Sequence, residues 1–285
     1  MTNKDLIIKD ALTNNTIVVG VSGGKDSTAT CLFLIEKGYS PSQFDRVFID
    51  TGWESKKTYQ YLDELEKTIG TIHRIKADIP IKAENKDFIQ QIERKIGFES
   101  AMIRRIVHYS MFPSRIRKWC TTSLKLKPLK AYFDTLDFDV LNVVGVRKEE
   151  SKRRSKLKEL EWNSMLDAYT WRPIINWKIQ DVIDIHKRFN LTPNPLYLES
   201  AERVGCFPCI MSRKKEIQAL SKQRIDIIRE IEDYISKGKE EKRTFFHNED
   251  IDTVFEWSKT SRGGKQFELF NLETPSCFKW GMCGT

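Results

Sequence analysis

The feature that most constrains the fold is an apolar run that ends in two glycines and leads directly into a helical pattern. The run TIVVGV (16–21) is typical of a buried strand, and TATCLFLIEKG (28–38) is typical of a helix that ends near Gly38. Between them lies SGGKDS (22–27). Glycines allow a tight turn and close backbone approach, and the free amides and dipole of a helix start attract anions. The sequence therefore predicts a phosphate-binding loop between strand and helix.

The side chains of this loop suit a nucleotide phosphate. Lys25 adds a full positive charge, and hydroxyl groups can donate hydrogen bonds to phosphate oxygens. Asp26 can cap the helix or help to hold Mg²⁺ on a phosphate. We therefore expect the nucleotide to contact Ser22, Gly23, Gly24, Lys25, Asp26 and Ser27.

Strand and helix patterns alternate beyond this loop. Segments 46–52, 71–77 and 139–147 read as strands, while 54–70 and 172–190 hold helices. Such alternation predicts an α/β fold with an open, mostly parallel twisted sheet and helices on both faces. We expect this nucleotide-binding domain to cover 1–190, and a mostly helical region with a cysteine-rich metal or cluster site to cover 191–285.

Composition narrows the class of protein. Hydrophobic residues make up 40% of the 285 residues, enough for a proper core, and no stretch approaches the roughly 20 apolar residues of a membrane span. The amino-terminal residues lack the apolar segment of a secretory signal. We expect a cytoplasmic protein without a membrane partner. The net charge of +8 suits phosphate-bearing partners, nucleotides or nucleic acid, although a merely basic surface explains it too. The sequence indicates no particular oligomeric state.

Two further strand ends carry candidate ligand residues. Asp50 and Thr51 follow the second strand, where ligands of open α/β sheets bind, so adenine or ribose contacts are expected there. Arginines after the strand at 139–147 can bind a phosphate, a sulfate or a nucleic-acid backbone. The candidates there are Gly145, Arg147, Glu150 and Arg154. A solvated charge run is the alternative interpretation of that segment.

Six cysteines are present, and two of them, Cys206 and Cys209, flank Phe-Pro in a Cys-x-x-Cys pair. The pair can supply two thiolates to one metal centre, with Cys120 and then Cys277 or Cys283 as further ligands. All-thiolate ligation suits either a [4Fe-4S] cluster or Zn²⁺. The alternative is a redox pair or two buried, reduced thiols. Cys31 is expected in the core.

These motifs together carry a resemblance to known families. SGGKDS resembles the PP-loop of the adenine-nucleotide α-hydrolase superfamily, which grips the pyrophosphate of ATP. Over roughly 16–213 the chain resembles the phosphoadenosine phosphosulfate (PAPS) reductase family, through RKWCTTSLKLKPL (117–129), VVGVRKEESKRR (143–154), PNPLY (193–197) and GCFPC (205–209). The family pattern G-x-R-x-x-E-S-x-x-R is satisfied from Gly145 to Arg154. The G-C-x-P-C element implies a [4Fe-4S] cluster rather than zinc, with Cys120, Cys206, Cys209 and Cys277 as its ligands.

The chain also departs from the reductases of that family. Reductases usually have a degenerate first loop, whereas SGGKDS is the intact ATP type. They end in a Glu-Cys-Gly-x-His segment, whose cysteine is the nucleophile. This chain ends GMCGT, so Cys283 and Gly284 match that segment only in part. The pattern is similar to the ATP-using branch, which includes the sulfurtransferase of DNA phosphorothioation.

The resemblance implies an ATP-dependent sulfurtransferase that adenylates an acceptor and then transfers sulfur to it. The expected catalytic residues are Lys25, Asp26, Arg147 and Cys283. The expected ligands are ATP (or APS/PAPS) and Mg²⁺. A nucleic-acid acceptor and a sulfur-donor protein are the expected partners. Two alternatives remain: a thiol-dependent APS/PAPS reductase that produces sulfite, and a non-catalytic nucleotide and iron–sulfur regulator that binds DNA or protein.

Overall fold

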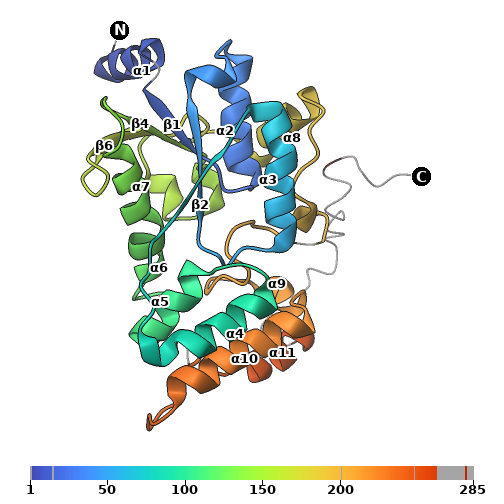
Figure 1. Cartoon of the computed structure of the whole chain (residues 1–285). Helices are drawn as coiled ribbons and strands as arrows, with labels where there is room; N and C mark the ends of the chain where they lie inside the picture. Colours follow the sequence, from blue (N-terminus) through green and yellow to red (C-terminus); the bar gives the residue numbers. More distant parts are fainter. Residues whose placement is uncertain (1, 15, 200, 247, 262–279, 281–285) are drawn as a thin grey trace.

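The computed structural model describes residues 2–14, 16–199, 201–246, 248–261 and 280. Figure 1 shows an α/β layer built on a twisted sheet, with a lobe of helices packed beyond the carboxyl end of strand β2. None of the described helices has the length and apolarity needed to cross a membrane.

The sheet has six strands in the order β3-β2-β1-β4-β6-β5. All neighbouring pairs are parallel except β5 with β6, which is antiparallel. The expected α/β fold with an open, mostly parallel sheet is therefore confirmed. The strands are β1 (Ile17–Gly20), β2 (Asp45–Asp50), β3 (His73–Lys76), β4 (Leu141–Val144), β5 (Leu160–Asn163) and β6 (Ala168–Trp171).

Helices cover both faces of the sheet, and others form the separate lobe (Figure 1). One face packs against α1 (Asn3–Thr13), α2 (Lys25–Glu36), α3 (Lys56–Ile69) and α8 (Ile179–Arg188). The other face packs against α7 (Lys127–Phe133), which follows the short α6 (Trp119–Thr121). The lobe contains α4 (Lys86–Ile96), α5 (Ala101–Tyr109), α9 (Lys214–Gln218), α10 (Lys222–Ser236) and α11 (Ile251–Lys259).

Alternation along β1 explains why this strand is central. Ile17 and Val19 face the core beneath α2 and α3, while Val18 faces the core beneath α7. Side chains of a strand point alternately to opposite faces, so a strand that is apolar at every position is buried on both sides. The strand that carries the glycine loop is thus fixed in the middle of the sheet.

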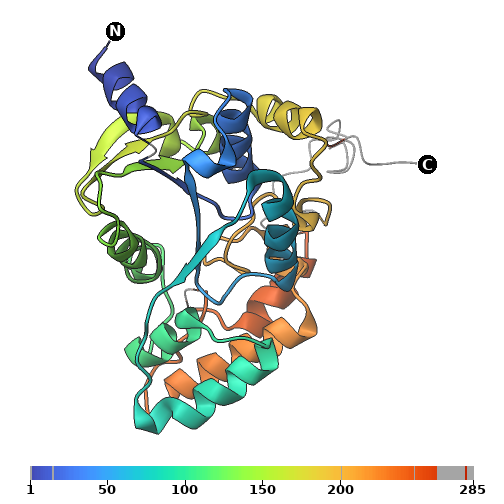
Figure 2. The same ribbon diagram turned by 45° about the horizontal axis from the view of Figure 1, so that its top comes forward.

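The helical lobe takes its members from both sides of residue 190. Ile89 and Ile92 of α4 share one core with Ile228 and Ile231 of α10. Figure 2, turned by 45°, shows α4 and α10 side by side below the sheet. A domain division into 1–190 and 191–285 stays a prediction, because this core joins segments from both.

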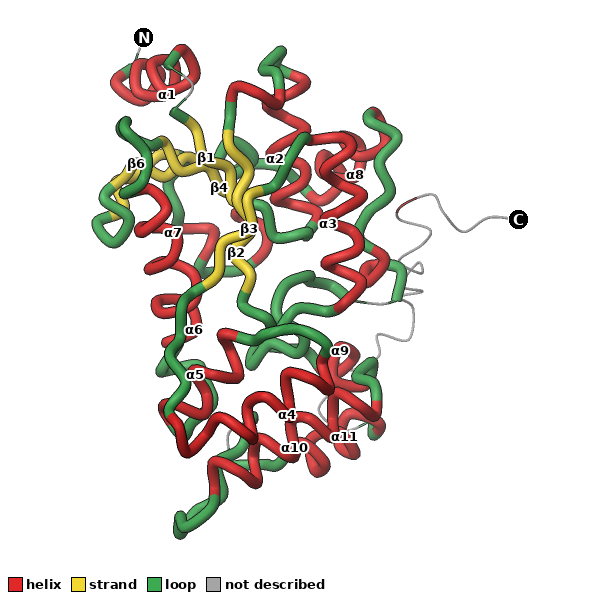
Figure 3. The backbone as a smooth tube through the Cα atoms, viewed as in Figure 1, coloured by secondary structure: helices red, strands yellow, loops and turns green. Residues whose placement is uncertain are grey.

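Several elements differ from the sequence-based expectation. The helical segment RKKEIQALSKQRIDIIREIEDYISKGKEEKR (213–243), which reads as one helix in the sequence, forms two helices, α9 and α10. Ser221 begins the second one, because its side chain accepts a hydrogen bond from the Arg224 amide at the start of α10. The hairpin β5–β6 adds an antiparallel edge that the strand–helix alternation did not indicate. Figure 3 shows this sheet in yellow among the surrounding helices.

Candidate functional site

The loop between β1 and α2 is a tight turn braced from within. Gly23 has a positive φ of 70°, and a Cβ there would come within 2.9 Å of Thr58 Cγ2 on α3. The Ser22 amide donates to Ser27 Oγ (3.1 Å), and Ser27 Oγ donates to the Gly24 carbonyl (2.9 Å). These serine hydroxyls therefore hold the turn in shape, and Gly24 caps α2 without a side chain over the helix start. Amides at a helix start can bind an anion, although here the Gly24 amide donates to Ser22 Oγ (3.3 Å).

Lys25 is the first residue of α2 and lies partly buried beside the loop. Its ammonium donates to the Glu202 carbonyl (3.2 Å), lies 3.6 Å from Asp26 Oδ2 and lies 4.6 Å from the centroid of the Tyr197 ring. Burial lowers the pKa of Lys25 more than Asp26 raises it. The ammonium is thus a partly desolvated cation, which an anionic ligand would stabilise.

Asp26 forms a buried ion pair with Arg147 across the sheet edge. Arg147 Nε lies 2.5 Å from Asp26 Oδ1, and the side chains are only 4% and 12% exposed. Burial disfavours the arginine charge, but attraction to Asp26 outweighs it and raises the pKa of Arg147. Arg147 Nη1 is buried and makes no hydrogen bond among the described residues, although it lies 3.3 Å from Glu149 Oε1. Nη1 therefore keeps unused hydrogen-bonding capacity, although Glu149 already balances part of its charge.

The segment after β4 brings its motif residues to the same edge. A Cβ on Gly145 would lie 2.3 Å from the Asp26 carbonyl, so only glycine lets β4 pass so close to α2. Glu150 accepts a hydrogen bond from the Arg147 amide (2.8 Å) and forms an ion pair with Arg154. Ser151 Oγ accepts from the Arg154 amide (3.2 Å). Glu150 thus organises the two arginines instead of facing a ligand itself.

The two predicted ligand residues after β2 mainly brace their own turn. Asp50 Oδ1 accepts from the Gly52 amide and from the Tyr59 hydroxyl, both at 2.7 Å. Thr51 is fully buried and donates to Glu54 Oε1 (2.7 Å). Nucleotide contact by Asp50 and Thr51 stays a prediction.

The Cys-x-x-Cys loop is attached directly to this turn. The Phe207 amide donates to the Trp53 carbonyl (2.9 Å), and Trp53 Nε1 donates to the Pro208 carbonyl (3.0 Å). Cys206 Sγ lies 3.8 Å from Thr51 Oγ1. The structure therefore places the cysteine pair next to the end of β2, which the sequence did not indicate.

Three of the predicted metal ligands gather around one ammonium group. The thiolate form of Cys206 raises the pKa of Lys125 most, and Cys120 and Cys209 act in the same direction. Burial raises the pKa of Cys120, and it raises that of Cys206 to about 12. The thiols of Cys120 and Cys206 are therefore protonated at neutral pH unless a cation binds them.

The same cysteines do not form a ligand set for a metal as they stand. Across the described part of the chain, no three His, Cys, Asp or Glu side chains are grouped to hold a metal ion. Cys277 and Cys283 lie outside the described residues. The described side chains thus do not by themselves fit a cluster or a structural zinc.

Asp26 does not fit a Mg²⁺ site either in this arrangement. Its Oδ1 binds Arg147, and its Oδ2 faces the Lys25 ammonium at 3.6 Å. Mg²⁺ needs free carboxylate oxygens or water. The predicted metal role of Asp26 is therefore not supported by its contacts.

Sequence reasoning missed two residues that support the loop, and a buried histidine on α8. Tyr197 accepts a hydrogen bond from the Lys25 amide (3.1 Å), and Asn194 donates to the Gly23 carbonyl (3.1 Å). His186 on α8 is buried, its Nδ1 lies 2.7 Å from the Val182 carbonyl, and burial lowers its pKa to about 4. The segment PNPLY carried a signal for the first two, since prolines on both sides fix the asparagine.

The carboxyl-terminal segment also reaches this region through one described residue. The Trp280 ring lies 5.2 Å from the His186 ring and 6.3 Å from the Tyr197 ring, centroid to centroid. Trp280 therefore lies beside Tyr197, which contacts the glycine loop.

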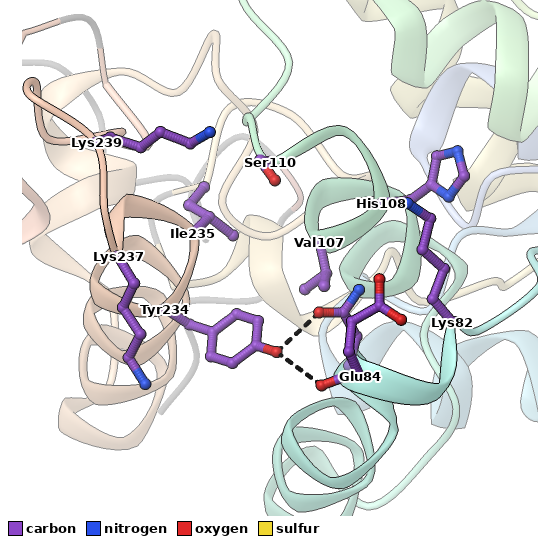
Figure 4. A pocket seen from close by; sticks show the side chains of 10 residues that line it. Lys82, Glu84, Val107, His108, Ser110, Tyr234, Ile235, Lys237 and Lys239 are labelled. Atoms are coloured by element: carbon purple, nitrogen blue, oxygen red, sulfur yellow. Dashed lines mark hydrogen bonds between the residues drawn. The ribbon is translucent and has the colours of Figure 1, made fainter.

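A hollow lined by lysines lies elsewhere, in the helical lobe. Figure 4 shows its lining side chains, and its volume is about 320 Å³. Lys82, Lys237 and Lys239 line it where α5 and α10 both end, and Tyr234 donates to Asn85 Oδ1 (2.8 Å). The carbonyl ends of helices attract cations, which explains these lysines without a ligand. We therefore place the functional site at the glycine loop.

Comparison with known proteins agrees with this geometry. The phosphoadenosine phosphosulfate reductase domain matches residues 16–212. An uncharacterised 37.8 kDa protein of Escherichia phage 186 is 28% identical over 88% of this chain and 90% of its own length. The adenosine 5'-phosphosulfate reductase of Oceanobacillus iheyensis is 26% identical over 58% of this chain and 60% of its own length, so the chain spans less than two thirds of that enzyme.

A solved structure extends the similarity to the fold. PAPS reductase from Candida auris, in its phosphate complex, superposes with a TM-score of 0.50 at 15% identity, covering 73% of this chain and 90% of that one. The matched segment covers more than half of the chain and contains the glycine loop, the Arg147 segment and the Cys-x-x-Cys loop. The chain therefore belongs to the phosphoadenosine phosphosulfate reductase domain family.

Proposed function

We propose that the chain is an ATP-dependent enzyme that adenylates an acceptor and transfers sulfur to it. The β,γ-phosphates of ATP bind the loop Ser22–Ser27, and the α-phosphate faces Arg147. The acceptor is a nucleic acid, and a separate protein donates the sulfur.

One observation carries this proposal: the buried pair of Arg147 with Asp26, in which Arg147 Nη1 makes no hydrogen bond among the described residues and faces only Glu149 Oε1, at 3.3 Å. A buried guanidinium nitrogen without a hydrogen bond is suited to an anion that arrives with the substrate and takes the place of Glu149. Lys25, partly desolvated at the start of the same helix, adds a second cation. Two such cations beside a glycine-rich helix start support triphosphate binding.

The first step would be attack on the α-phosphate. An acceptor oxygen forms a bond to the α-phosphorus, and the bond to the β-phosphate oxygen breaks, so pyrophosphate leaves. Negative charge builds up on the phosphate oxygens during this transfer. Lys25 and Arg147, held in place before the reaction, stabilise that charge. Asp26 acts as a positioning residue, because it fixes the Arg147 guanidinium.

The second step would replace the adenylated oxygen with sulfur. A persulfide sulfur carried on Cys283 attacks the acceptor carbon, the carbon–oxygen bond breaks, and AMP leaves. The product is then joined to Cys283 through a disulfide, which a second thiol cleaves. Trp280, three residues before Cys283 in sequence, lies beside Tyr197, and this supports delivery from the carboxyl-terminal segment.

The metal centre stays a prediction in this scheme, and no step depends on it. Cys206, Cys209 and Cys120, with Cys277, are the residues predicted to bind a [4Fe-4S] cluster or Zn²⁺. Anaerobic purification followed by iron, sulfide and zinc analysis tests that prediction. Protein with less than about 0.1 equivalent of both metals would contradict it.

The test of the proposal uses ATP labelled at the α-phosphate. Incubation with candidate nucleic-acid acceptors and a persulfide donor should release labelled AMP together with pyrophosphate. The Lys25→Ala protein should release neither, while Lys37→Ala, at an exposed position at the other end of α2, should behave as the wild type. Absence of AMP and pyrophosphate with every acceptor would refute the mechanism.

Reduction of APS or PAPS to sulfite is the second candidate function. The similarity to the Oceanobacillus iheyensis enzyme, named as an adenosine 5'-phosphosulfate reductase, favours it. A thioredoxin-coupled assay with APS and PAPS separates the two functions, because only the reductase forms sulfite.

A further inference from the structure

We infer that the basic segment after β4 and the exposed aromatic pair on the β5–β6 hairpin form one binding surface for single-stranded nucleic acid. This inference rests on the proposed function in one respect, since it identifies the surface that holds the acceptor. The surface consists of Lys152, Arg153, Lys156, Lys158, Trp162 and Tyr169.

The aromatic pair lies on the free edge of the sheet. β5 is the last strand in the order, and Trp162 lies opposite Tyr169 in the β5–β6 register. The two rings are 5.1 Å apart at 79°, yet Trp162 is 53% exposed and Tyr169 is 36% exposed. Two large rings left open to solvent on one face can stack with nucleic-acid bases.

The cations in the preceding segment are exposed. Lys152, Arg153, Lys156 and Lys158 are exposed, and within the described ranges their side chains form no ion pair. By contrast, Arg154 in the same segment is held by Glu150. Many exposed cations elsewhere in this chain form ion pairs, such as Arg188 with Glu36. Four exposed cations in a run of seven residues, without an ion pair among the described residues, suit a phosphodiester backbone.

The hairpin holds these two groups together. Arg172, which follows β6, donates to the Lys158 carbonyl (2.8 Å), and its amide donates to the Glu159 carbonyl (2.7 Å). The end of the basic segment is therefore fixed to the hairpin. Trp162 is four positions after Lys158, a span of at most about 14 Å in an extended chain. Bases on the rings and phosphates on the lysines can thus belong to one short strand.

The surface is also continuous with the proposed active site. Arg154 precedes Lys156 by two residues and is joined through Glu150 to the Arg147 amide. β5 runs antiparallel to β6, so Leu160 lies opposite Trp171 at the end of the sheet where Arg147 emerges. A strand bound along this surface leads toward the buried arginine. Open rings select single strands, because bases in a duplex are already stacked.

The experiment measures binding of a fluorescein-labelled 20-nucleotide single strand, as DNA and as RNA, by anisotropy without ATP. Changing Lys152, Lys156 and Lys158 together to Ala should weaken binding and reduce the slope of log K against log salt by about 2, at about 0.7 per phosphate contact. The matched control changes Lys82, Lys237 and Lys239 to Ala, which removes the same charge from the hollow in Figure 4. This control should keep the wild-type slope.

The rings are tested separately. Trp162→Ala should weaken single-strand binding about 5- to 150-fold, the range of base–aromatic stacking, and Trp162→Phe should restore most of it. Trp257→Ala, at another exposed tryptophan, is the control and should have no effect. Equal losses in surface and control variants, or binding of a duplex that is as tight and insensitive to Trp162, would overturn the inference.

These outcomes are distinct from failure of the proposed function. ATP cleavage to AMP and pyrophosphate with no dependence of nucleic-acid binding on this surface would refute the inference alone. Binding through this surface without any AMP formation would refute the adenylation scheme and leave the surface established.

Discussion

Arg147 Nε lies 2.5 Å from Asp26 Oδ1, although 121 residues separate the two in sequence. The pair joins the carboxyl end of β4 to the first turn of α2, and both side chains are nearly buried. Removing one partner leaves the other as a buried, uncompensated charge. The pair is therefore both a structural contact and the feature that aims Arg147 at the proposed phosphate.

Asp26→Asn should destabilise the protein and weaken nucleotide binding at once. Loss of one partner of a buried pair costs about 3–5 kcal/mol, and the freed guanidinium no longer has a fixed direction. Chemical denaturation gives the change in the free energy of unfolding, and calorimetry with ATP gives the change in affinity. Arg153→Gln, at an exposed position in the segment that follows Arg147, is the control and should change the free energy of unfolding by less than about 0.5 kcal/mol. Wild-type stability in the Asp26→Asn protein would show that the pair is not formed in solution.

Lys25→Met should weaken ATP binding without lowering the stability of the folded protein. Burial already lowers the pKa of Lys25, so the folded protein loses stabilisation by keeping this charge. An apolar side chain of similar length should therefore leave the melting temperature unchanged or higher, while ATP binding weakens at least tenfold. Thermal denaturation and calorimetry measure the two effects, and Lys37→Met is the control for charge alone. Unchanged ATP affinity would remove Lys25 from the binding site.

The glycine loop could be predicted from the sequence, because every residue that forms it is close in sequence to the others. The apolar run of β1, the glycines and the helix that follows are consecutive in sequence, from Ile17 to Glu36, and each indicates the same turn. The motif from Gly145 to Arg154 was likewise read correctly as a strand end followed by a polar loop. The ion pair of Arg147 with Asp26 was not foreseen, because no local pattern shows which strand ends meet.

Other parts depended on contacts between distant segments. LEWN (160–163) and AYTW (168–171) are too short for a clear period, and they form strands because each gains a partner at the edge of the sheet. The helical lobe joins α4 and α5 to α10 and α11 through a core whose members lie more than a hundred residues apart. The link from Cys206 to the end of β2 has the same origin, since backbone hydrogen bonds to Trp53 carry no sequence signature.

Gly145→Ala tests the close approach of β4 to α2. The added Cβ would lie 2.3 Å from the Asp26 carbonyl and 2.6 Å from the Ser27 amide nitrogen, so the backbone must shift. We expect a loss of at least about 1–3 kcal/mol in the free energy of unfolding, the usual range for overpacking, and weaker ATP binding because the Asp26 turn moves. The matched control is Gly20→Ala in β1, where the nearest atom is 3.8 Å away and ordinary contact results. Equal effects of the two substitutions would mean that the approach is looser than described.

Glu232 on α10 should make stability depend on pH. Its carboxylate is fully buried and accepts hydrogen bonds from the Phe245 amide (2.8 Å) and the Ile251 amide (3.2 Å). Burial nevertheless raises its pKa from 4.5 to about 7. Between these values the folded protein keeps a proton that the unfolded chain has released. The contribution of Glu232 to the free energy of unfolding is therefore fully present below pH 4.5. This free energy falls by up to about 3 kcal/mol as the pH rises to 7.

Glu232→Gln should remove this dependence, because the amide resembles the protonated acid and cannot ionise. Denaturation at pH 5, 6, 7 and 8 gives the slope for both proteins, and the difference between them isolates Glu232. His186 acts in the opposite direction, because its lowered pKa costs stability as the pH falls below 6.5, but it contributes equally to both proteins. Glu230→Gln, at a more exposed position on the same helix, should keep the wild-type slope. If Glu232→Gln also keeps that slope, the carboxyl is ionised in the folded protein and its two backbone donors outweigh its burial.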